Sequence, residues 1–215
     1  MATPAALVDL MHHQATVLRH DAVMSQQQVV TQIATLPCYV DAGKADTQPP
    51  AMTAYIGLTD AAPVRQGDYI ELGGPTGEWP TMWLIGNVQT WWDQHGDYWC
   101  QQADLDAPAV SCEIENPNTT PDAEGRFQGW TTVLTMIGGI RPLTVSEQRR
   151  ASQDGQVINL VMRFPQGLDG MITRSQRVKV ISGGYTGTYE VLTIEHHPDA
   201  FTAMLRNYDP AGTPV

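Results

Sequence analysis

Paired histidines are the residues of this sequence whose types could bind a metal ion. Positions 12–13 hold one pair, and His196 and His197 form a second pair between Glu195 and Asp199. Histidine nitrogens and carboxylate oxygens are common zinc ligands. Neighbouring residues of a strand point to opposite faces of a sheet, so His196 and His197 cannot chelate one ion together. Solvated surface histidines are therefore the favoured interpretation, and a metal site that adds Glu195 and Asp199 is the alternative.

Other residue patterns that support catalysis are missing from the sequence. It contains no nucleophile elbow, no phosphate-binding glycine loop followed by a helix, and no HExxH motif. The Gly-Gly pairs at 73–74 and 183–184 have strand-like residues on both sides, whereas dinucleotide binding needs a strand, a loop and a helix. Asp68 precedes a predicted strand and is best interpreted as a turn carboxylate that bonds its own backbone. We therefore expect no catalytic residue, no metal, no cofactor, and a function other than an enzyme's.

Tryptophans crowd into one part of the chain, and most of the 6 lie between positions 79 and 99. Trp is enriched in buried contacts and at subunit interfaces, so we favour core or interface positions for them. A platform on which carbohydrate rings or single-stranded bases stack is the alternative. The candidate interface or core aromatics are Trp79, Trp83, Trp91, Trp92 and Trp99.

The composition indicates a β-rich protein that does not grip nucleic acid. The 15 Pro and 19 Gly among 215 residues favour short strands and turns over long helices. A net charge of −11 argues against a protein that grips phosphates with clustered Lys and Arg. Cys38, Cys100 and Cys112 lack metal-site spacing, and their odd number indicates reduced intracellular thiols. No apolar run approaches the roughly 20 residues of a membrane span, and no signal-peptide pattern occurs, so we expect no membrane association.

The elements that would carry these residues repeat along the chain. Residues 65–89 and 173–197 share a polar approach, an alternating strand, a Gly-Gly pair, a Thr-Gly tip and a returning strand. Strands joined by glycine-rich turns predict hairpins. Two further pairs of strand-like runs precede the hairpins in the same order, which indicates a tandem duplication. These pairs are 15–18 with 131–134, and 52–58 with 157–164.

The predicted fold class is therefore all-β, with two small β-barrel or SH3-like domains in tandem and a short N-terminal helix. We assign residues 1–14 to the helical segment, 15–105 to the first domain and 129–215 to the second. Residues 106–128 are acidic and proline-rich, which predicts a linker. Long polar loops are expected at 41–52 and at 143–155, in equivalent places of the two halves. Within the second loop, Ser146-Glu147-Gln148 could start a helical turn.

Residues 130–208 are similar in the order and spacing of their elements to one known family. They resemble the head-closure proteins of tailed bacteriophages, also called head-to-tail connector or stopper proteins. Residues 15–105 follow the same outline more loosely. The resemblance is carried by Arg141-Pro142-Leu143, Glu147, Gln153, the alternating run 157–164, Ile172, Arg177-Val178-Lys179-Val180 and Gly187-Thr188-Tyr189-Glu190-Val191.

The resemblance implies a structural protein of the virion neck that is assembled in the host cytoplasm. Such a protein forms a homo-oligomeric ring, of six or twelve copies, between the portal or adaptor proteins and the tail-terminator or tail tube proteins. Packaged DNA passes through the lumen or is held there by long loops. In this chain the candidate lumen residues are Lys44, Asp46, Gln48, Pro49, Arg149, Arg150, Gln153 and Asp154. The alternatives are a tail-terminator or baseplate-type ring protein, and a sugar-binding β module that uses the tryptophans.

Overall fold

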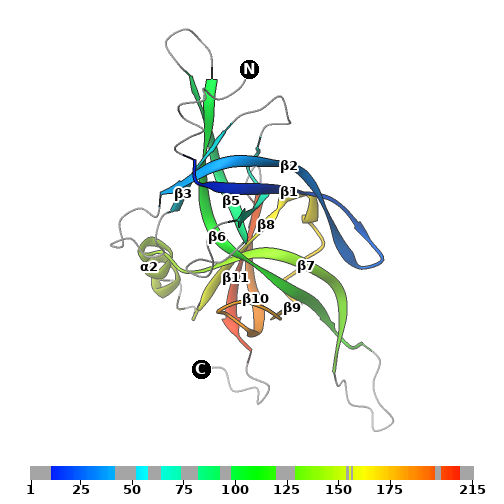
Figure 1. Ribbon diagram of the computed structural model, residues 1–215. Coiled ribbons are helices and arrows are strands. Elements are labelled where there is room, and N and C mark those ends of the chain that lie inside the picture. Colours follow the sequence, from blue (N-terminus) through cyan, green and yellow to red (C-terminus); the bar gives the residue numbers. More distant parts are fainter. Residues whose placement is uncertain are drawn as a thin grey trace. The chain divides into compact units, whose positions relative to one another are not determined.

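The chain is built almost entirely of β-strands (Figure 1). The computed structural model describes residues 11–41, 52–57, 64–73, 82–92, 98–119, 129–153, 155, 157–196 and 200–208. The all-β class expected from the sequence is confirmed. The strands are β1 (His13–Met24), β2 (Gln27–Asp41), β3 (Met52–Gly57), β4 (Tyr69–Gly73), β5 (Met82–Trp92), β6 (Tyr98–Pro117), β7 (Trp130–Pro142), β8 (Leu160–Pro165), β9 (Arg177–Val180), β10 (Gly187–His196) and β11 (Ala200–Asn207). Within the described residues, the helical elements are α2 (Val145–Gln153) and the 3-10 turn η1 (Gln166–Leu168).

Contacts along the chain divide it into two compact units. Unit 1 comprises Met1–Asp21 and Val30–Ala109, and unit 2 comprises Ala22–Val29 and Val110–Val215. Strand β6 contributes its first part to unit 1 and its second part to unit 2. The turn between β1 and β2 belongs to unit 2, although most of both strands belongs to unit 1.

The strands of unit 1 pair in a closed cycle. Their order is β1, β4, β5, β6, β3 and β2, and a β1–β2 pairing closes it. The registers place Val17 opposite Ile70 and Ile70 opposite Trp83, all of them buried. Such cross-strand apolar pairs are the unit of sheet stabilisation. The core gathers inward-facing residues from every strand of the cycle, among them Ala15, Val17, Leu36, Cys38, Ala54, Ile56, Ile70, Trp83, Ile85, Ala103 and Leu105.

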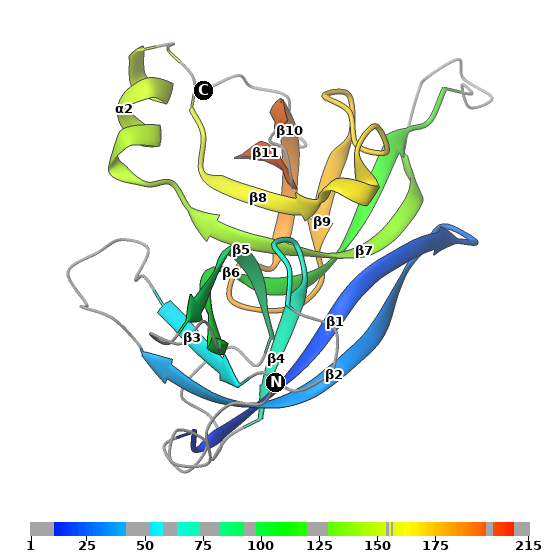
Figure 2. The same ribbon diagram turned by 90° about the horizontal axis from the view of Figure 1, so that it is seen from above.

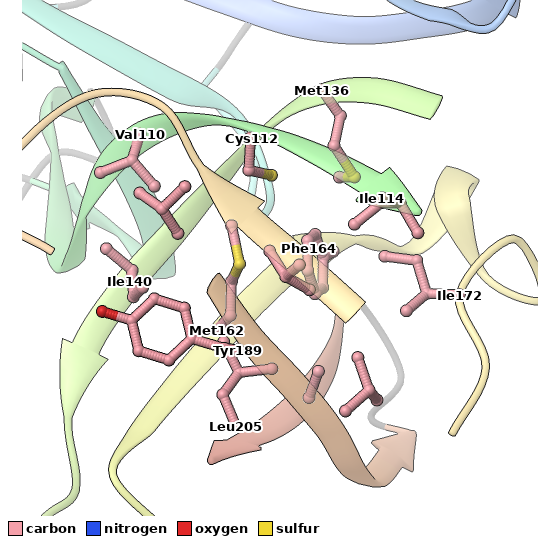
Figure 3. Packing of buried hydrophobic residues seen from close by; sticks show 14 of the residues in the cluster. Val110, Cys112, Ile114, Met136, Ile140, Met162, Phe164, Ile172, Tyr189 and Leu205 are labelled. Carbon is pink, nitrogen blue, oxygen red and sulfur yellow. The ribbon is translucent and has the colours of Figure 1, made fainter. Parts of the chain in front are cut away.

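Unit 2 has a closed cycle of its own. Its order is the second part of β6, then β9, β10, β11, β8 and β7, and a β6–β7 pairing closes it. Val178 lies opposite Ile114 on one side and Tyr189 on the other. Figure 3 shows the core that these strands enclose, where Phe164 stacks on Phe201 with ring centroids 4.9 Å apart.

The two cycles have the same order of pairing. Strands β7, β8, β9 and β10 of unit 2 correspond to β2, β3, β4 and β5 of unit 1, in that order. The second part of β6 corresponds to β1, and β11 corresponds to the first part of β6. The predicted repeated hairpins are thus β4–β5 and β9–β10, and the predicted runs 52–58 and 157–164 contain β3 and β8. The expected match of 15–18 with 131–134 is wrong. Residues Cys112–Glu115 of β6 pair with β9 in the same way as Gln14–Leu18 of β1 pair with β4, so the counterpart of 15–18 lies in β6.

A tight turn before β4 holds Asp68 in the role expected from the sequence. The backbone N–H of Asp68 donates to the carbonyl of Arg65 at 3.1 Å, and Asp68 Oδ2 accepts from the Arg65 N–H at 2.8 Å. The same carboxylate accepts hydrogen bonds from Nε and Nη2 of Arg19, on β1, at 2.7 and 2.8 Å. The interpretation of Asp68 as a turn carboxylate is therefore confirmed.

An equivalent turn precedes β9 in unit 2. The N–H of Gln176 donates to the carbonyl of Thr173 at 3.2 Å, and Gln176 Oε1 accepts from the Thr173 N–H at 2.6 Å. The side chain of Gln176 also donates to Asn116, on β6, at 2.7 Å. The side chains of Asp68 and Gln176 thus make equivalent hydrogen bonds. Each bonds a backbone N–H of its own turn and a side chain of a neighbouring strand, β1 for Asp68 and β6 for Gln176.

The residues expected to form a linker at 106–128 are in part a strand. Residues 106–117 lie in β6, and 120–128 fall outside the described residues. Besides Cys100 and Glu115, the buried positions of β6 are 101, 103, 105 and 107 in unit 1, and 110, 112 and 114 in unit 2. Alternation of buried and exposed residues is a signature of a strand, but in β6 this alternation shifts by one residue at Pro108 and Ala109. The buried residues are also mostly small. The acidic residues between them made the stretch look like a solvated connection.

The loop expected at 143–155 contains helix α2. Arg149, Arg150 and Gln153 therefore lie on a helix, and the loop assignment for them is wrong. Thr144 and Glu147 have the spacing of a capping box, which begins a helix. The counterpart loop at 41–52 is outside the described residues except for its two end residues, as are residues 1–10 of the predicted N-terminal helix. His13, the next-to-last residue of that predicted segment, already lies in β1. Among the described helices, none is long and apolar enough to span a membrane.

Candidate functional site

The predicted lumen residues that the structure describes lie on one face of α2. Arg149, Arg150 and Gln153 are exposed there, and Arg150 Nη1 lies 3.8 Å from Glu195 Oε1 on β10. The remaining predicted lumen residues fall outside the described part of the chain. These are Lys44, Asp46, Gln48, Pro49 and Asp154.

Helix α2 follows the end of β7 in the chain (Figure 2). An ionic clasp between Arg141 and Glu147 holds the start of α2 to the end of β7. Arg141 donates from Nη1 and Nη2 to the two carboxylate oxygens of Glu147, at 2.8 and 2.9 Å. Glu147 Oε2 also accepts from the backbone N–H of Thr144 at 2.7 Å and from its hydroxyl at 2.9 Å. A bidentate guanidinium pair is strong and fixes geometry, so this clasp sets where α2 begins.

The surroundings of Glu147 lower its pKa from 4.5 to about 2. Partial burial acts to raise the pKa, but the hydrogen bonds and charge of Arg141 and the hydrogen bonds of Thr144 outweigh it. All of these favour the ionised carboxylate. Glu147 is therefore a fixed anion that positions α2, and a poor proton donor near neutral pH.

The apolar contact beneath α2 is small. It consists of Leu143, Ala151 and Val161, with the half-buried Ile158 packed against them. Ala151 is the buried residue of the helix. The clasp therefore carries much of the attachment of α2, and the outer face is left to Arg149, Arg150 and other polar residues.

A second group of charged residues forms a row across unit 2. Glu115 on β6 lies opposite Arg177 on β9, Arg177 opposite Glu190 on β10, and Glu190 opposite Arg206 on β11. Arg177 Nε donates to Glu115, and Arg206 donates from Nε and Nη2 to Glu190. Acid and base thus alternate from strand to strand. Opposite charges directly across a ladder stabilise it, so the row ties four neighbouring strands in register.

Two aromatic rings cover the guanidinium of Arg177. Its Cζ lies 4.4 Å from the ring centroid of Trp130 and 5.0 Å from that of Tyr208. The two rings meet edge to face, with centroids 5.7 Å apart. Each cation–π contact of this kind contributes on the order of 0.5–1 kcal/mol. The start of β7 and the end of β11 are therefore fastened to the charged row.

The sequence reasoning missed this row, although a signal was present. Glu113 and Glu115 alternate on β6, and Lys179 and Arg177 alternate on β9. Lys179 Nζ donates to Glu113 Oε2 at 2.9 Å, parallel to the Glu115–Arg177 pair. Matching acid-x-acid and base-x-base patterns indicate two antiparallel strands that face each other.

The tryptophans do not share one environment. Trp83 belongs to the core of unit 1, with 5% of its surface exposed. Trp91 is 47% exposed, and its indole N–H donates to Gln102 Oε1 at 2.9 Å. Trp92 and Trp99 lie in β5 and β6, but their side chains are outside the described part of the structure, as is all of Trp79.

His196, a member of the histidine site considered first, contacts an aspartate in the structure. His196 Nδ1 lies 3.0 Å from Asp169 Oδ1, and both side chains are exposed. His197 and Asp199 are outside the described residues. Within the described part of the chain, no three His, Cys, Asp or Glu residues gather closely enough to hold a metal ion.

The cysteines Cys38, Cys100 and Cys112 are free thiols, and all are buried. Burial raises the pKa of each, for Cys38 to about 12. Since the thiolate is the reactive form, these side chains act as small apolar residues of the cores.

Comparisons of the chain with protein-family models, with curated proteins and with solved structures found no match.

Proposed function

We propose that this protein is a structural neck component of a tailed phage virion. In this role, copies of the chain form a ring between the portal or adaptor and the tail. The ring closes the DNA exit channel and offers the tail a docking surface. Each closed cycle of strands acts as a small barrel of the SH3-like kind, and the two barrels are tandem copies of one ancestral domain.

The observation that carries the proposal is the repeat of one pairing order in both units. The connections between β2 and β3 and between β7 and β8 occupy equivalent places in the two cycles. A scaffold of paired strands with variable connections suits a protein that acts by fitting against neighbours. The resemblance of residues 130–208 to the head-closure proteins supplies the particular assembly.

The exposed arginines of α2 give the proposal a testable detail. Arg149 and Arg150 carry positive charge on a chain whose net charge is −11. In a channel, this pair would contact the phosphates of DNA while the acidic remainder of the lumen would not adhere to it. Replacement of both by alanine should weaken DNA retention and leave ring formation unchanged, since neither supports the fold.

The test is electron microscopy and light scattering of the purified protein, alone and with DNA-filled heads that lack a tail. Rings of six or twelve copies, or addition of the protein to the portal vertex, are expected. Arg174→Ala, at another exposed arginine of unit 2, is the matched control for the α2 variant. A protein that neither forms rings nor binds heads contradicts the proposal, and loss of rings in the α2 variant contradicts the lumen position of its arginines.

A further inference from the structure

The turn between β1 and β2 extends unit 2 by a short arm, which we define as Ala22–Val29. Gln27 of the arm pairs in parallel with Thr135 of β7. The N–H of Thr135 donates to the carbonyl of Gln26 at 2.8 Å, and the N–H of Ile137 donates to Gln28 Oε1 at 2.7 Å. The arm therefore adds a strand segment to β7 by β-augmentation.

The shape of the arm suits docking. Ser25 and Gln26 have φ values of 50° and 64°, so the turn is a two-residue turn of the primed kind, which keeps β1 and β2 side by side up to the tip (Figure 1). Val23 packs against the core of unit 2, whereas Met24 is 64% exposed. Val23 is thus an apolar anchor of the arm, beside the hydrogen bonds that join the arm to β7.

The arm is an addition to unit 2 and is not needed to close its strand cycle. That cycle runs through β6, β9, β10, β11, β8 and β7 without it. Strand β8 pairs with Gly139–Pro142 of β7, and the arm pairs earlier on β7, at Thr135. Without an arm, the N–H groups of Thr135 and Ile137 would lose these acceptors, and unpaired edge groups attract another strand.

The charge pattern favours a second copy of the chain as the donor of that strand. The arm, AVMSQQQV, has no charged residue, and neither has β7 from Trp130 to Ile140. The whole chain has a net charge of −11, so most of its surface repels another copy. Natural edge strands are usually protected by charged side chains. These two neutral segments can meet between copies without like-charge repulsion.

We propose that in the assembled protein the arm of one copy pairs with β7 of the next. Each copy gives one arm and receives one, and every bond described above forms between chains instead of within one. Exchange of identical elements is a low-cost route to oligomers. A contact that joins different surfaces of successive copies closes into a ring when the rotation allows it. The exchange of arms requires only that copies of the chain associate with one another. The closure of these copies into a ring rests, in addition, on the proposed function.

The test uses two chains of different length, one with Gln27→Cys and the other with Thr135→Cys. These residues face each other in register, whereas the native thiols are buried. The chains are unfolded, mixed, refolded and oxidised gently, and the products are separated without reductant. Exchange predicts a disulfide-linked dimer with one chain of each length. Thr31→Cys, at an exposed position of β2 outside the arm, replaces Gln27→Cys in the control and should give no such dimer.

A chain that carries both cysteines separates the outcomes further. Exchange predicts a ladder of linked chains, and an arm bound within its own chain predicts a linked monomer, which overturns the inference. Rings without mixed dimers would likewise refute arm exchange while leaving the proposed function intact. A protein that stays monomeric at every concentration, alone and with heads, contradicts both.

A variant without new thiols checks the same point. Gln28→Ala removes the acceptor of the Ile137 N–H and should lower the association constant about tenfold per arm, the effect of one lost hydrogen bond in a buried contact. Gln32→Ala, on β2 outside the arm, should leave it unchanged. Equal association by both variants would argue against an arm between chains.

Discussion

The clasp between β7 and α2 makes the stability of the protein depend on pH in a predictable way. Glu147→Gln keeps the shape of the side chain but removes the charge that Arg141 neutralises. The amide can still accept one bond from Thr144, but it places N–H groups against the donors of the guanidinium. Arg141 is 10% exposed at its side chain, so the variant leaves a largely buried cation without its anion, which destabilises the folded state.

The size of the effect follows from the pKa of Glu147. In the folded state it is about 2, against an ordinary value of 4.5. A difference of this size corresponds to about 3 kcal/mol of stabilisation at neutral pH. Solvent screens this carboxylate, whose side chain is 21% exposed, so we expect about 1–2 kcal/mol in practice.

The sign follows from the direction of the shift. Because the folded pKa lies below the unfolded one, the stabilisation is complete above about pH 4.5 and is lost as the pH falls toward about 2. Urea unfolding followed by circular dichroism at several pH values measures it. Glu147→Gln should unfold at lower urea than the parent chain near pH 7, and the gap should shrink below about pH 4.

Glu195→Gln is the matched control, because Glu195 lies 3.8 Å from Arg150 in a largely exposed pair. It should change stability by less than about 0.5 kcal/mol at any pH. A gap between Glu147→Gln and the parent chain that stays constant from neutral to acidic pH would refute this account of the clasp.

Three further substitutions test other parts of the structure by urea unfolding. Gln26→Gly removes a side chain from a φ of 64° and should stabilise the protein by about 1 kcal/mol. Gly138→Ala would place Cβ 2.5 Å from Met162 Cε and 3.0 Å from Phe164 Cε1, so overpacking should cost about 1–3 kcal/mol. Arg177→Lys keeps the charge but loses the flat guanidinium that lies over Trp130, and should cost about 1 kcal/mol.

Each of these expectations has an outcome that would contradict it. Thr31→Gly is the control for Gln26→Gly and should destabilise the protein, because Thr31 lies within β2. If Thr31→Gly also stabilised the protein, the positive φ of Gln26 would not be the cause of the Gln26→Gly effect. Met162→Ala should partly rescue Gly138→Ala by making room, and an additive loss would place the clash elsewhere. An Arg177→Lys protein as stable as the parent chain would show that the ring contacts contribute little.

Several strands and the two repeated hairpins could be predicted because their signals are local. The hairpins β4–β5 and β9–β10 are indicated by alternating apolar residues and by the glycines between the strands. The role of Asp68 followed from its position in a turn. These features depend on a few neighbouring residues, so the sequence contains the information directly.

The features that were missed depend on partners far away in the sequence. The row from Glu115 to Arg206 exists because four strands meet in one register, which no single stretch reveals. For helix α2, the polar loop expected from the sequence allows only a helical turn at Ser146-Glu147-Gln148, although the capping-box spacing of Thr144 and Glu147 indicates the start of a full helix. The arm was unforeseeable, because residues 22–29 belong with strands that come a hundred positions later.

The division of β6 between the two units bears on how this protein can be dissected. A fragment that begins at residue 129 would lack the segment that pairs with Arg177–Val180, and its apolar face would be open to water. A fragment that begins at Val110 would keep it. A cut that keeps the strand cycle of unit 2 complete therefore falls inside β6.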